Sequence, residues 1–205
     1  MFRSIIALFK KEPSPSSLEE KLDLLARFGF RLEEPFTVDD LLTSWSRDVF
    51  EKPGFNMILV GLGMTEEKPP WRNHCPTVWH FDTECIEDNG DYVRIAERMK
   101  TLAQGSLPIC GLRDQVDIEE GIAWLEFDFE GKTIHVDCKV NDDWVDEAVF
   151  SRFAHILSIS DPTKIFLYYD LGGQDCILAC ATKTQFKELK QAGIAFKPLT
   201  GATIG

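Results

Sequence analysis

The sequence lacks the features that define several large classes of protein. No apolar run approaches the roughly 18–20 residues that a membrane-spanning helix needs, and the six cysteines include no CxxC pair. There is no Walker loop, no GxGxxG, no GxSxG and no HExxH motif, so the common nucleotide-binding and hydrolase signatures are absent. We therefore expect a cytoplasmic protein with reduced thiols and no cofactor.

Positive charge is also scarce, and the acidic excess lies in one part of the chain. The sequence has 22 Lys and Arg against 34 Asp and Glu, a formal net charge of -12. Residues 82–147 alone carry 18 acidic and 6 basic side chains. Such a surface repels phosphate, which disfavours nucleic acid and anionic membranes as direct partners. It favours a basic protein partner; a solvated face that maintains solubility is the alternative.

At 205 residues the chain has the length of one domain rather than two. Residues 1–16 are predicted to be a leader and linker, with a short apolar stretch followed by a segment rich in proline and serine. The apolar stretch is shorter than a signal peptide requires, so we expect an amphipathic helix packed on the body, with a membrane-surface anchor as the alternative. Residues 17–205 are predicted to form a single domain.

The apolar periodicity and the capping and turn residues predict an α+β fold. We expect an antiparallel or mixed β-sheet with helices packed mainly on one face. Helices are predicted at 17–28, 37–45, about 91–104, about fifteen residues from Asp142 or Asp143, and 182–192. Strands are predicted at 55–62 and 77–83, in hairpins at 124–140 and 164–182, and at 194–199.

The clearest of these elements is the hairpin at 124–140. Its first strand alternates apolar and acidic residues, and its second alternates apolar residues with His135, Asp137 and Lys139. Period-two alternation places one face on the core and the other in solvent. The hairpin at 164–182 is apolar on both faces, which predicts a central position in the sheet.

Four possible zinc ligands fall within twelve residues: His74, Cys75, His80 and Cys85. Zinc ligands typically come in pairs two to four residues apart, whereas the intervals here are one, five and five. We therefore predict no metal site from these residues.

Two His-x-Asp pairs, His80 with Asp82 and His135 with Asp137, each lie on one face of a predicted strand. If the two strands were neighbours, the four side chains could form a divalent-metal or acid–base site, and the protein would be a metal-assisted hydrolase. The alternative is that they are ordinary polar residues of solvent-facing strands.

A cysteine follows a glycine pair in the string from Asp170 to Cys176. Cys176 could be a nucleophile if a histidine lowered its pKa. The glycines serve equally as a hairpin turn that needs positive φ, with Cys176 and Cys180 as core residues.

Three strings within the acidic α+β body resemble the small acidic immunity proteins of bacterial polymorphic-toxin systems: WHFDTE at 79–84, DDWVD at 142–146 and DLGGQDC at 170–176. The resemblance spans residues 17–199 and implies a non-enzymatic protein that binds and blocks a cognate toxin, often through an acidic face. Our hypothesis is that an acidic sheet face sequesters a basic protein partner. The residues predicted to face the partner are Asp82, Glu84, Glu126, Asp128, Glu130, Asp142, Asp143 and Asp146.

Overall fold

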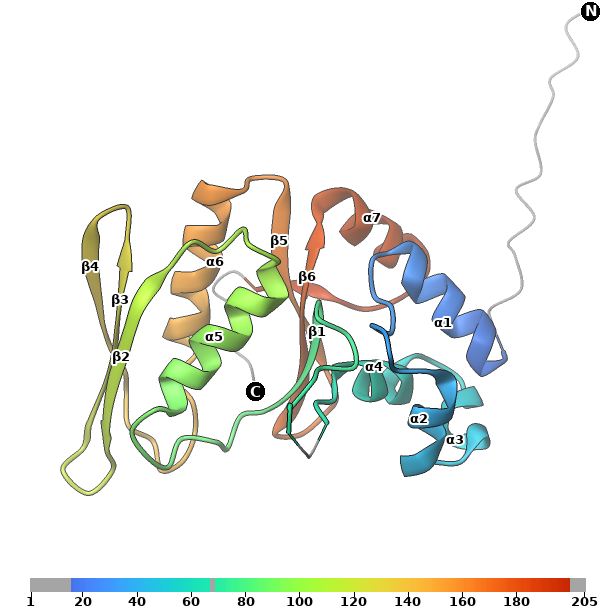
Figure 1. Cartoon of the computed structure of the whole chain (residues 1–205), viewed down its shortest axis with the longest axis horizontal. Helices are drawn as coiled ribbons and strands as arrows, with labels where there is room; N and C mark the ends of the chain where they lie inside the picture. The colour runs from blue at the N-terminus through green and yellow to red at the C-terminus, as the bar shows by residue number, and fades with distance from the viewer. Residues whose placement is uncertain (1–15, 67–68, 200–205) are drawn as a thin grey trace, which may run out of the picture.

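Two antiparallel sheets with a pair of helices between them organise residues 16–66 and 69–199, the part of the chain that the computed structural model describes. From left to right in Figure 1, the layers are a three-stranded sheet, helices α5 and α6, a four-stranded sheet, and the remaining helices. The three-stranded sheet has the order β2-β3-β4, and the four-stranded sheet has the order β1-β6-β5-β7. The α+β class and the antiparallel pairing predicted from the sequence are confirmed, with two sheets in place of one.

The bounds of the elements follow the sequence expectations at most positions. The strands are β1 (Val78–Asp82), β2 (Cys110–Asp117), β3 (Ile122–Phe129), β4 (Lys132–Asp137), β5 (Lys164–Asp170), β6 (Asp175–Thr182) and β7 (Lys197–Pro198). The helices are α1 (Leu18–Arg27), α2 (Val38–Ser44), α3 (Arg47–Glu51), α4 (Asn56–Gly63), α5 (Asp91–Ala103), α6 (Ala148–Ser160) and α7 (Lys183–Gln191). None of these described helices is long and apolar enough to cross a membrane. Nearly all of the predicted leader lies outside the described residues.

Each face of the four-stranded sheet closes a separate hydrophobic core. Phe166 and Leu178 face α5, α6 and the three-stranded sheet, whereas Leu167 and Ile177 face α1, α4 and α7. All four side chains are buried. As the two-faced apolar pattern predicts, β5 and β6 are the inner strands of this sheet.

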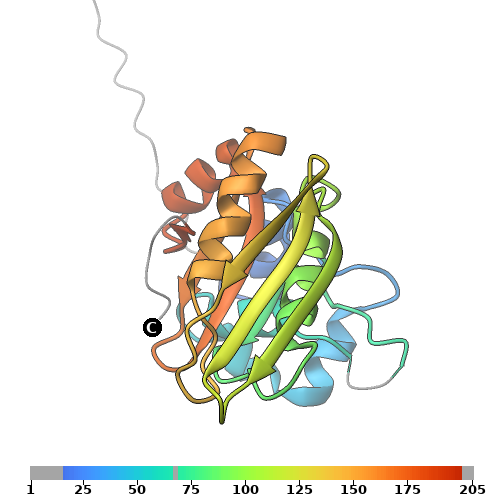
Figure 2. The same cartoon turned by 90° about the vertical axis from the view of Figure 1, so that its left-hand side faces the viewer.

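The three-stranded sheet has helices on one face only. Leu125 and Phe127 of β3 and Val136 of β4 point into the core that α5 and α6 close. The opposite face is free of described helices and faces the viewer in Figure 2. The hairpin at 124–140 therefore has one buried and one exposed face, as its alternation predicts.

The strand predicted at 55–62 is wrong, because Asn56–Gly63 forms helix α4. A short apolar run does not by itself distinguish a buried strand from a buried helix. This segment lies between the four-stranded sheet and helices α1 and α3, so it buries apolar side chains on more than one side. Ile58, Leu59 and Leu62 are completely buried there.

Gly63, the last residue of α4, determines how closely this helix approaches the sheet. A Cβ atom at this position would lie 2.3 Å from the backbone nitrogen of His80 in β1. No side chain fits such a gap, so the glycine allows α4 to rest directly on the backbone of β1.

The helix predicted to begin near Asp143 begins instead at Ala148. The preceding residues run beside the end of β1, where the N–H of Val145 donates to the carbonyl of Thr83 at 2.9 Å. Asp146 then accepts the N–H of Ala148 at 2.9 Å. These hydrogen bonds hold the segment extended and delay the helix by one turn.

Strand β2 was not among the strands predicted from the sequence. Its alternation is hidden because Asp114 occupies the core-facing position between Leu112 and Val116. The carboxylate accepts the N–H groups of Gly90 at 2.8 Å and Val93 at 3.0 Å, at the start of α5. Unpaired N–H groups at a helix N-terminus favour a carboxylate, which explains an acidic residue on this side of the sheet.

Arg98 of α5 holds the segment that precedes β1. The residue is 9% exposed, and its guanidinium donates to the carbonyls of Cys75, Pro76 and Val78 at 3.3, 3.4 and 2.6 Å. The guanidinium also lies 5.9 Å from the ring of Trp79. Helix α5 packs in the core next to the three-stranded sheet, and its Arg98 thereby holds Cys75 and Val78, which belong to the core on the other side of the four-stranded sheet.

Candidate functional site

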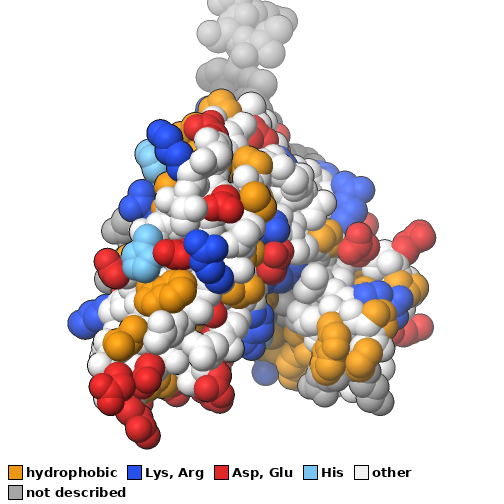
Figure 3. Space-filling model, turned by 60° about the vertical axis from the view of Figure 1, so that its left-hand side comes forward, with side chains coloured by type: hydrophobic (Ala, Val, Ile, Leu, Met, Phe, Trp, Pro, Cys, Tyr) orange, Lys and Arg blue, Asp and Glu red, His pale blue; other side chains and the backbone are white. Residues whose placement is uncertain are grey.

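The uncovered side of the three-stranded sheet, which we call the outer face, carries side chains from alternate positions of its strands. Its members are Arg113, Gln115, Ile122, Trp124, Glu126, Asp128, Thr133, His135 and Asp137. Figure 3 shows acidic, basic, histidine and apolar side chains intermixed on this side of the molecule. The indole N–H of Trp124 donates to Gln115 at 3.1 Å, and its ring lies 5.5 Å from that of His135.

Four ionisable side chains form a connected row across the outer face. Arg113 donates to one oxygen of Glu126, and the other oxygen lies 2.9 Å from Nδ1 of His135. Nε2 of His135 lies 3.1 Å from Asp137. A carboxylate can only accept, so both contacts are satisfied at once only when the imidazole carries two protons. With His135 charged, two positive and two negative groups cancel within the row.

The row makes the charge of the outer face depend on pH. Hydrogen bonds to Glu126 and then to Asp137 raise the pKa of His135 above its ordinary value. Hydrogen bonds from His135 and then Arg113 lower the pKa of Glu126. Loss of the His135 proton therefore leaves the row with a net negative charge.

Unneutralised acidic side chains gather elsewhere, along one end of the molecule that we call the acidic rim. Four segments meet along the lower edge in Figures 1 and 2: the β2–β3 turn, the stretch after β1, the segment before α6 and the β5–β6 turn. Hydrogen bonds join them: the N–H of Val116 donates to Asn89 at 2.7 Å, and the hydroxyl of Thr83 donates to the Gln174 carbonyl at 2.7 Å. The acidic rim consists of Asp82, Glu84, Glu87, Asp88, Asp117, Glu119, Glu120, Asp142, Asp143, Asp170 and Asp175.

The charge of the acidic rim is largely uncompensated. None of its side chains is buried. Within the described part of the chain, the one ion pair that they make joins Asp175 to His80 at 3.8 Å. Figure 3 shows acidic side chains clustered at the lower end of the sheet. Exposed carboxylates of one sign held together in this way generate a negative field around that end.

Two further carboxylates at this end, Asp91 and Asp146, are already held by local contacts; Asp91 also forms an ion pair with Arg94 at 2.9 Å. Helices α5 and α6 both begin here, and a helix N-terminus favours negative charge. Asp91 accepts the N–H groups of Glu87 and Asp88 at 2.8 and 2.9 Å, and Asp146 accepts that of Ala148 at 2.9 Å. We therefore do not count Asp91 and Asp146 in the acidic rim.

The eight residues predicted to face a partner do not share one sheet face. Four belong to the acidic rim: Asp82, Glu84, Asp142 and Asp143. The others are divided: Glu126 and Asp128 lie on the outer face, Glu130 follows β3 in the turn to β4, and Asp146 accepts the N–H of Ala148 at the start of α6. A single acidic sheet face would need the strand of Asp82 and the 124–140 hairpin to share a sheet, and they belong to different sheets.

The structure does not bring the two His-x-Asp pairs together. His80 and Asp82 lie on β1, which pairs with β6, whereas His135 and Asp137 lie on β4 of the other sheet. Among the described residues, no group of three or more His, Cys, Asp or Glu side chains is placed to hold a metal. The four-residue site of the hydrolase hypothesis is not formed.

The candidate cysteines and His74 have structural environments. Cys75 and Cys176 are buried, and burial raises the pKa of both thiols, which disfavours a reactive thiolate. Nδ1 of His74 lies 2.9 Å from the carbonyl of Gly61. All six cysteines are free thiols.

No protein-family model matches this chain, and comparison with curated proteins and with solved structures finds no significant match. The geometry of the chain itself is therefore the basis for its proposed function.

Sequence reasoning missed parts of both surfaces. Arg113 belongs to the unpredicted strand β2, so its pairing with Glu126 could not be anticipated. Glu119 and Glu120 contribute to the acidic excess, but they lie in a turn that becomes recognisable only once β2 is known. The one available signal was the density of acidic residues in the sequence.

Proposed function

We propose that this chain is a non-enzymatic binding protein that holds a basic protein partner against its acidic rim. One observation carries the proposal: carboxylates from four separate segments lie along one end, and within the described part of the chain Asp175 is the only one of these rim carboxylates with an ion-pair partner. Such a field attracts a cationic macromolecule, speeds association with it and repels nucleic acid.

The adjoining outer face supplies the apolar contact that charge alone does not provide. The β2–β3 turn joins the two surfaces, because Asp117 precedes it and Ile122 follows it. Ile122 is 44% exposed, and Trp124 lies half-buried beyond it. Aromatic anchors dominate the affinity of many interfaces, whereas peripheral charges mainly raise the association rate. We therefore expect the partner to contact Ile122 and Trp124 while its basic side chains approach the acidic rim.

Within this class, the particular function that we propose is toxin neutralisation by an immunity protein. A toxin domain that acts on nucleic acid needs a basic surface to hold phosphate. An acidic surface of complementary shape would cover that region and exclude the substrate. Inhibition by occupancy requires no catalytic residue in this chain, and the resemblance to acidic immunity proteins supports the same reading.

The test compares two variants of equal net charge. The acidic-rim variant combines Glu87→Gln, Glu119→Gln, Glu120→Gln and Asp142→Asn; the control variant combines Glu33→Gln, Glu34→Gln, Glu188→Gln and Asp39→Asn, all exposed positions outside the rim. Each removes four negative charges and changes the formal net charge from -12 to -8. We expect the acidic-rim variant to bind the protein encoded beside its gene at least about tenfold more weakly.

Two readouts make the comparison decisive. The protein encoded beside the gene of this chain is the candidate toxin, and its expression should stop cell growth. Co-expression of the unmodified chain or of the control variant should restore growth, and co-expression of the acidic-rim variant should not. Calorimetric affinities over a salt series should fall steeply for the unmodified chain and weakly for the acidic-rim variant. Equal weakening in both variants, or unchanged binding by the acidic-rim variant, contradicts a role for this surface.

A further inference from the structure

The two sheets have four edge strands, and three of them have features that oppose pairing with a further strand. On β1, the carbonyl of Val78 is already occupied by Arg98, which donates to it at 2.6 Å. Strand β7 has two residues, and one of them, Pro198, has no N–H to donate. On β2, a bulge interrupts the register with β3, and the N–H of Val116 donates to Asn89 at 2.7 Å. Short, bulged or covered edges of this kind are protected from other chains.

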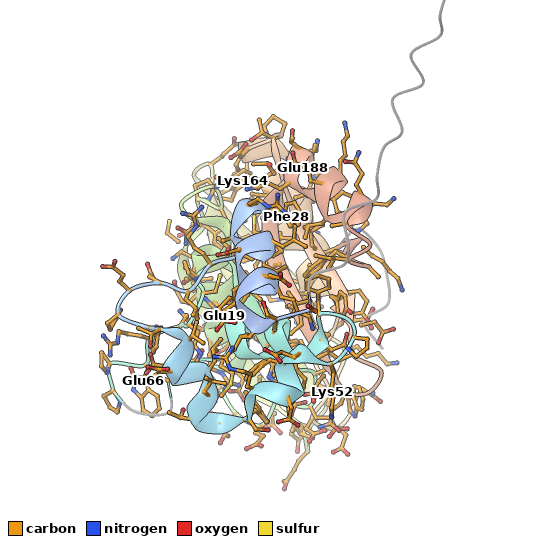
Figure 4. All side chains as sticks on the ribbon, turned by 90° about the vertical axis from the view of Figure 1, so that its right-hand side faces the viewer. Glu19, Phe28, Lys52, Glu66, Lys164 and Glu188 are labelled. Carbon is orange, nitrogen blue, oxygen red and sulfur yellow. The ribbon has the colours of Figure 1, made fainter. Side chains whose placement is uncertain are left out.

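The fourth edge strand, β4, lacks these features. It pairs with β3 in an unbroken register and contains no proline. It lies along one side of the outer face, at the end of the molecule that Figure 2 shows. Figure 4 shows the opposite end, which helices cover, with α1 between the labelled Glu19 and Phe28. The backbone of β4 is therefore the place to look for unused hydrogen-bonding groups.

Hydrogen bonds just beyond the end of β4 establish which of its residues point away from β3. The N–H of Cys138 donates to the carbonyl of Ala123 in β3 at 2.9 Å. The N–H of the next residue, Lys139, donates instead to the carboxylate of Asp146 at 2.6 Å. Because the direction of the backbone groups alternates along a strand, even-numbered residues of β4 face β3 and odd-numbered residues face the open edge.

Three residues of β4 thus present their backbone groups at the open edge: Thr133, His135 and Asp137. All three residues are exposed. Apart from the pairing with β3, no hydrogen bond from another described residue reaches their backbone N–H or carbonyl groups. The three residues span about 14 Å, at about 3.4 Å per residue. An extended segment placed beside them can pair with each N–H and carbonyl in turn, which is how peptides add to sheet edges.

The side chains of β4 define the segment that fits this edge. Ile134 packs against the core but is only partly buried, and an apolar side chain on a further strand would cover it. On the outer face, the side chain of Asp137 is 95% exposed. Opposite charges facing each other across two strands stabilise their pairing, so Asp137 favours a basic residue. The charges of Lys132, His135 and Asp137 oppose unselective pairing.

The position of the edge favours a basic protein over a second copy of this chain. After Asp137, the chain leaves β4 and enters the acidic rim at Asp142. A segment that lies along β4 is therefore part of a molecule held beside carboxylates, which requires positive charge. Two copies of this chain, each with a formal net charge of -12, would repel one another.

We infer that the basic partner adds an extended segment to the open edge of β4, as a fourth strand of the three-stranded sheet. This inference rests on the proposed function, because it concerns the partner held by the acidic rim. The segment runs antiparallel to β4, the pairing that is slightly more stable per residue. It carries an apolar residue opposite Ile134 and a basic residue opposite Asp137. Backbone hydrogen bonds supply its affinity, and these side chains supply its selectivity.

Hydrogen–deuterium exchange, followed in ¹H–¹⁵N spectra, tests the pairing directly. In the free chain, the amide of His135 should exchange faster than those of Ile134 and Val136, which face β3. Addition of the protein encoded beside the gene should slow exchange at Thr133, His135 and Asp137 at least about tenfold, because their N–H groups become hydrogen-bonded. The amides of Ile134 and Val136 serve as the internal control.

Two substitutions at Thr133 separate strand addition from folding. Thr133→Pro removes the outward N–H, and an edge strand tolerates proline where the N–H faces solvent. Thr133→Val keeps the N–H, and both variants lose the hydroxyl that donates to Asp128 at 2.7 Å. We expect Thr133→Pro to bind the partner at least about tenfold more weakly, and Thr133→Val to bind like the unmodified chain. If Thr133→Pro does not fold, the exchange measurement on the unmodified chain decides the question.

The possible outcomes distinguish this inference from the proposed function. Slower exchange at the three outward amides, together with weaker binding by Thr133→Pro, supports strand addition. Binding of the partner without slower exchange at these amides overturns strand addition and leaves the proposed function in place, as does equal binding by a folded Thr133→Pro and Thr133→Val. If the neighbouring protein does not bind at all, both proposals fail. A dimer of the free chain with the same amides protected would assign the edge to a second copy and overturn the inference.

Discussion

The two sheets of this protein use the same antiparallel pairing for different purposes. The four-stranded sheet is covered on both sides, and neighbouring residues of β6 such as Ile177 and Leu178 are buried in opposite cores. The three-stranded sheet is covered on one side only, so Leu125 is buried while Glu126, next to it, reaches solvent. One sheet therefore stabilises the fold on both faces, and the other leaves a face available for recognition.

The largest expected effect compares β6 with β3. Ile177→Ala and Leu178→Ala should each lower the free energy of unfolding by about 2–5 kcal/mol, because both faces of β6 are packed. On β3, the loss of unfolding free energy caused by Leu125→Ala should be in the same range. Ile122→Ala on the outer face should lower the free energy of unfolding by less than about 1 kcal/mol. Urea unfolding followed by circular dichroism measures all four. A loss of stability at Ile122 as large as that at Leu125 would show that the outer face is packed, which would contradict the contrast between the two sheets.

An intermediate effect is expected at the one acidic residue on the inner face of the three-stranded sheet. Asp114→Ala leaves the N–H groups of Gly90 and Val93 without their acceptor and should cost about 1–3 kcal/mol. The matched control is Asp137→Ala on the exposed side of β4, which should cost less than about 0.5 kcal/mol. Thermal and urea unfolding of the pair give the difference. If the two changes cost the same, the capping role assigned to Asp114 is incorrect.

The smallest expected effect is the pH dependence of the outer face. In a ¹H–¹³C titration, His135 should titrate above the ordinary value of about 6.5, and Glu126→Gln should bring its pKa down. A raised pKa in the folded state gives stabilisation that is present below the ordinary pKa and is lost as the pH rises through the folded-state pKa. Solvent exposure keeps this stabilisation small. An unshifted His135 in the unmodified chain would rule out the row of charges.

The elements that could be predicted from the sequence are those specified by local patterns. The hairpin at 124–140 alternates apolar and polar residues, and the hairpin at 164–182 is apolar on both faces, so each indicates its own environment. The segment at 56–63 is equally apolar but forms a helix, because its burial depends on neighbours that the local pattern does not specify. Strand β2 escaped prediction because the partner of Asp114 is a helix N-terminus more than twenty residues away.

The surfaces were less predictable than the elements, since they depend on which strands pair. The acidic excess was visible in the sequence, but its placement required knowing that β1 pairs with β6, and that the loop after β1 meets the segment before α6. Predicting that Glu126 is neutralised required knowing that Arg113 lies beside it on β2.

The four-stranded sheet is a wall common to both cores, and this has a consequence for how the molecule comes apart. If the helices on one side of β6 were to detach, the apolar residues they cover would be exposed, while the other side would lose its rigid backing. Arg98 strengthens this dependence by tying a helix of one core to the backbone bordering the other. The two halves should therefore melt together in a single cooperative transition, with no half-folded species to offer the apolar face of β6 to aggregation.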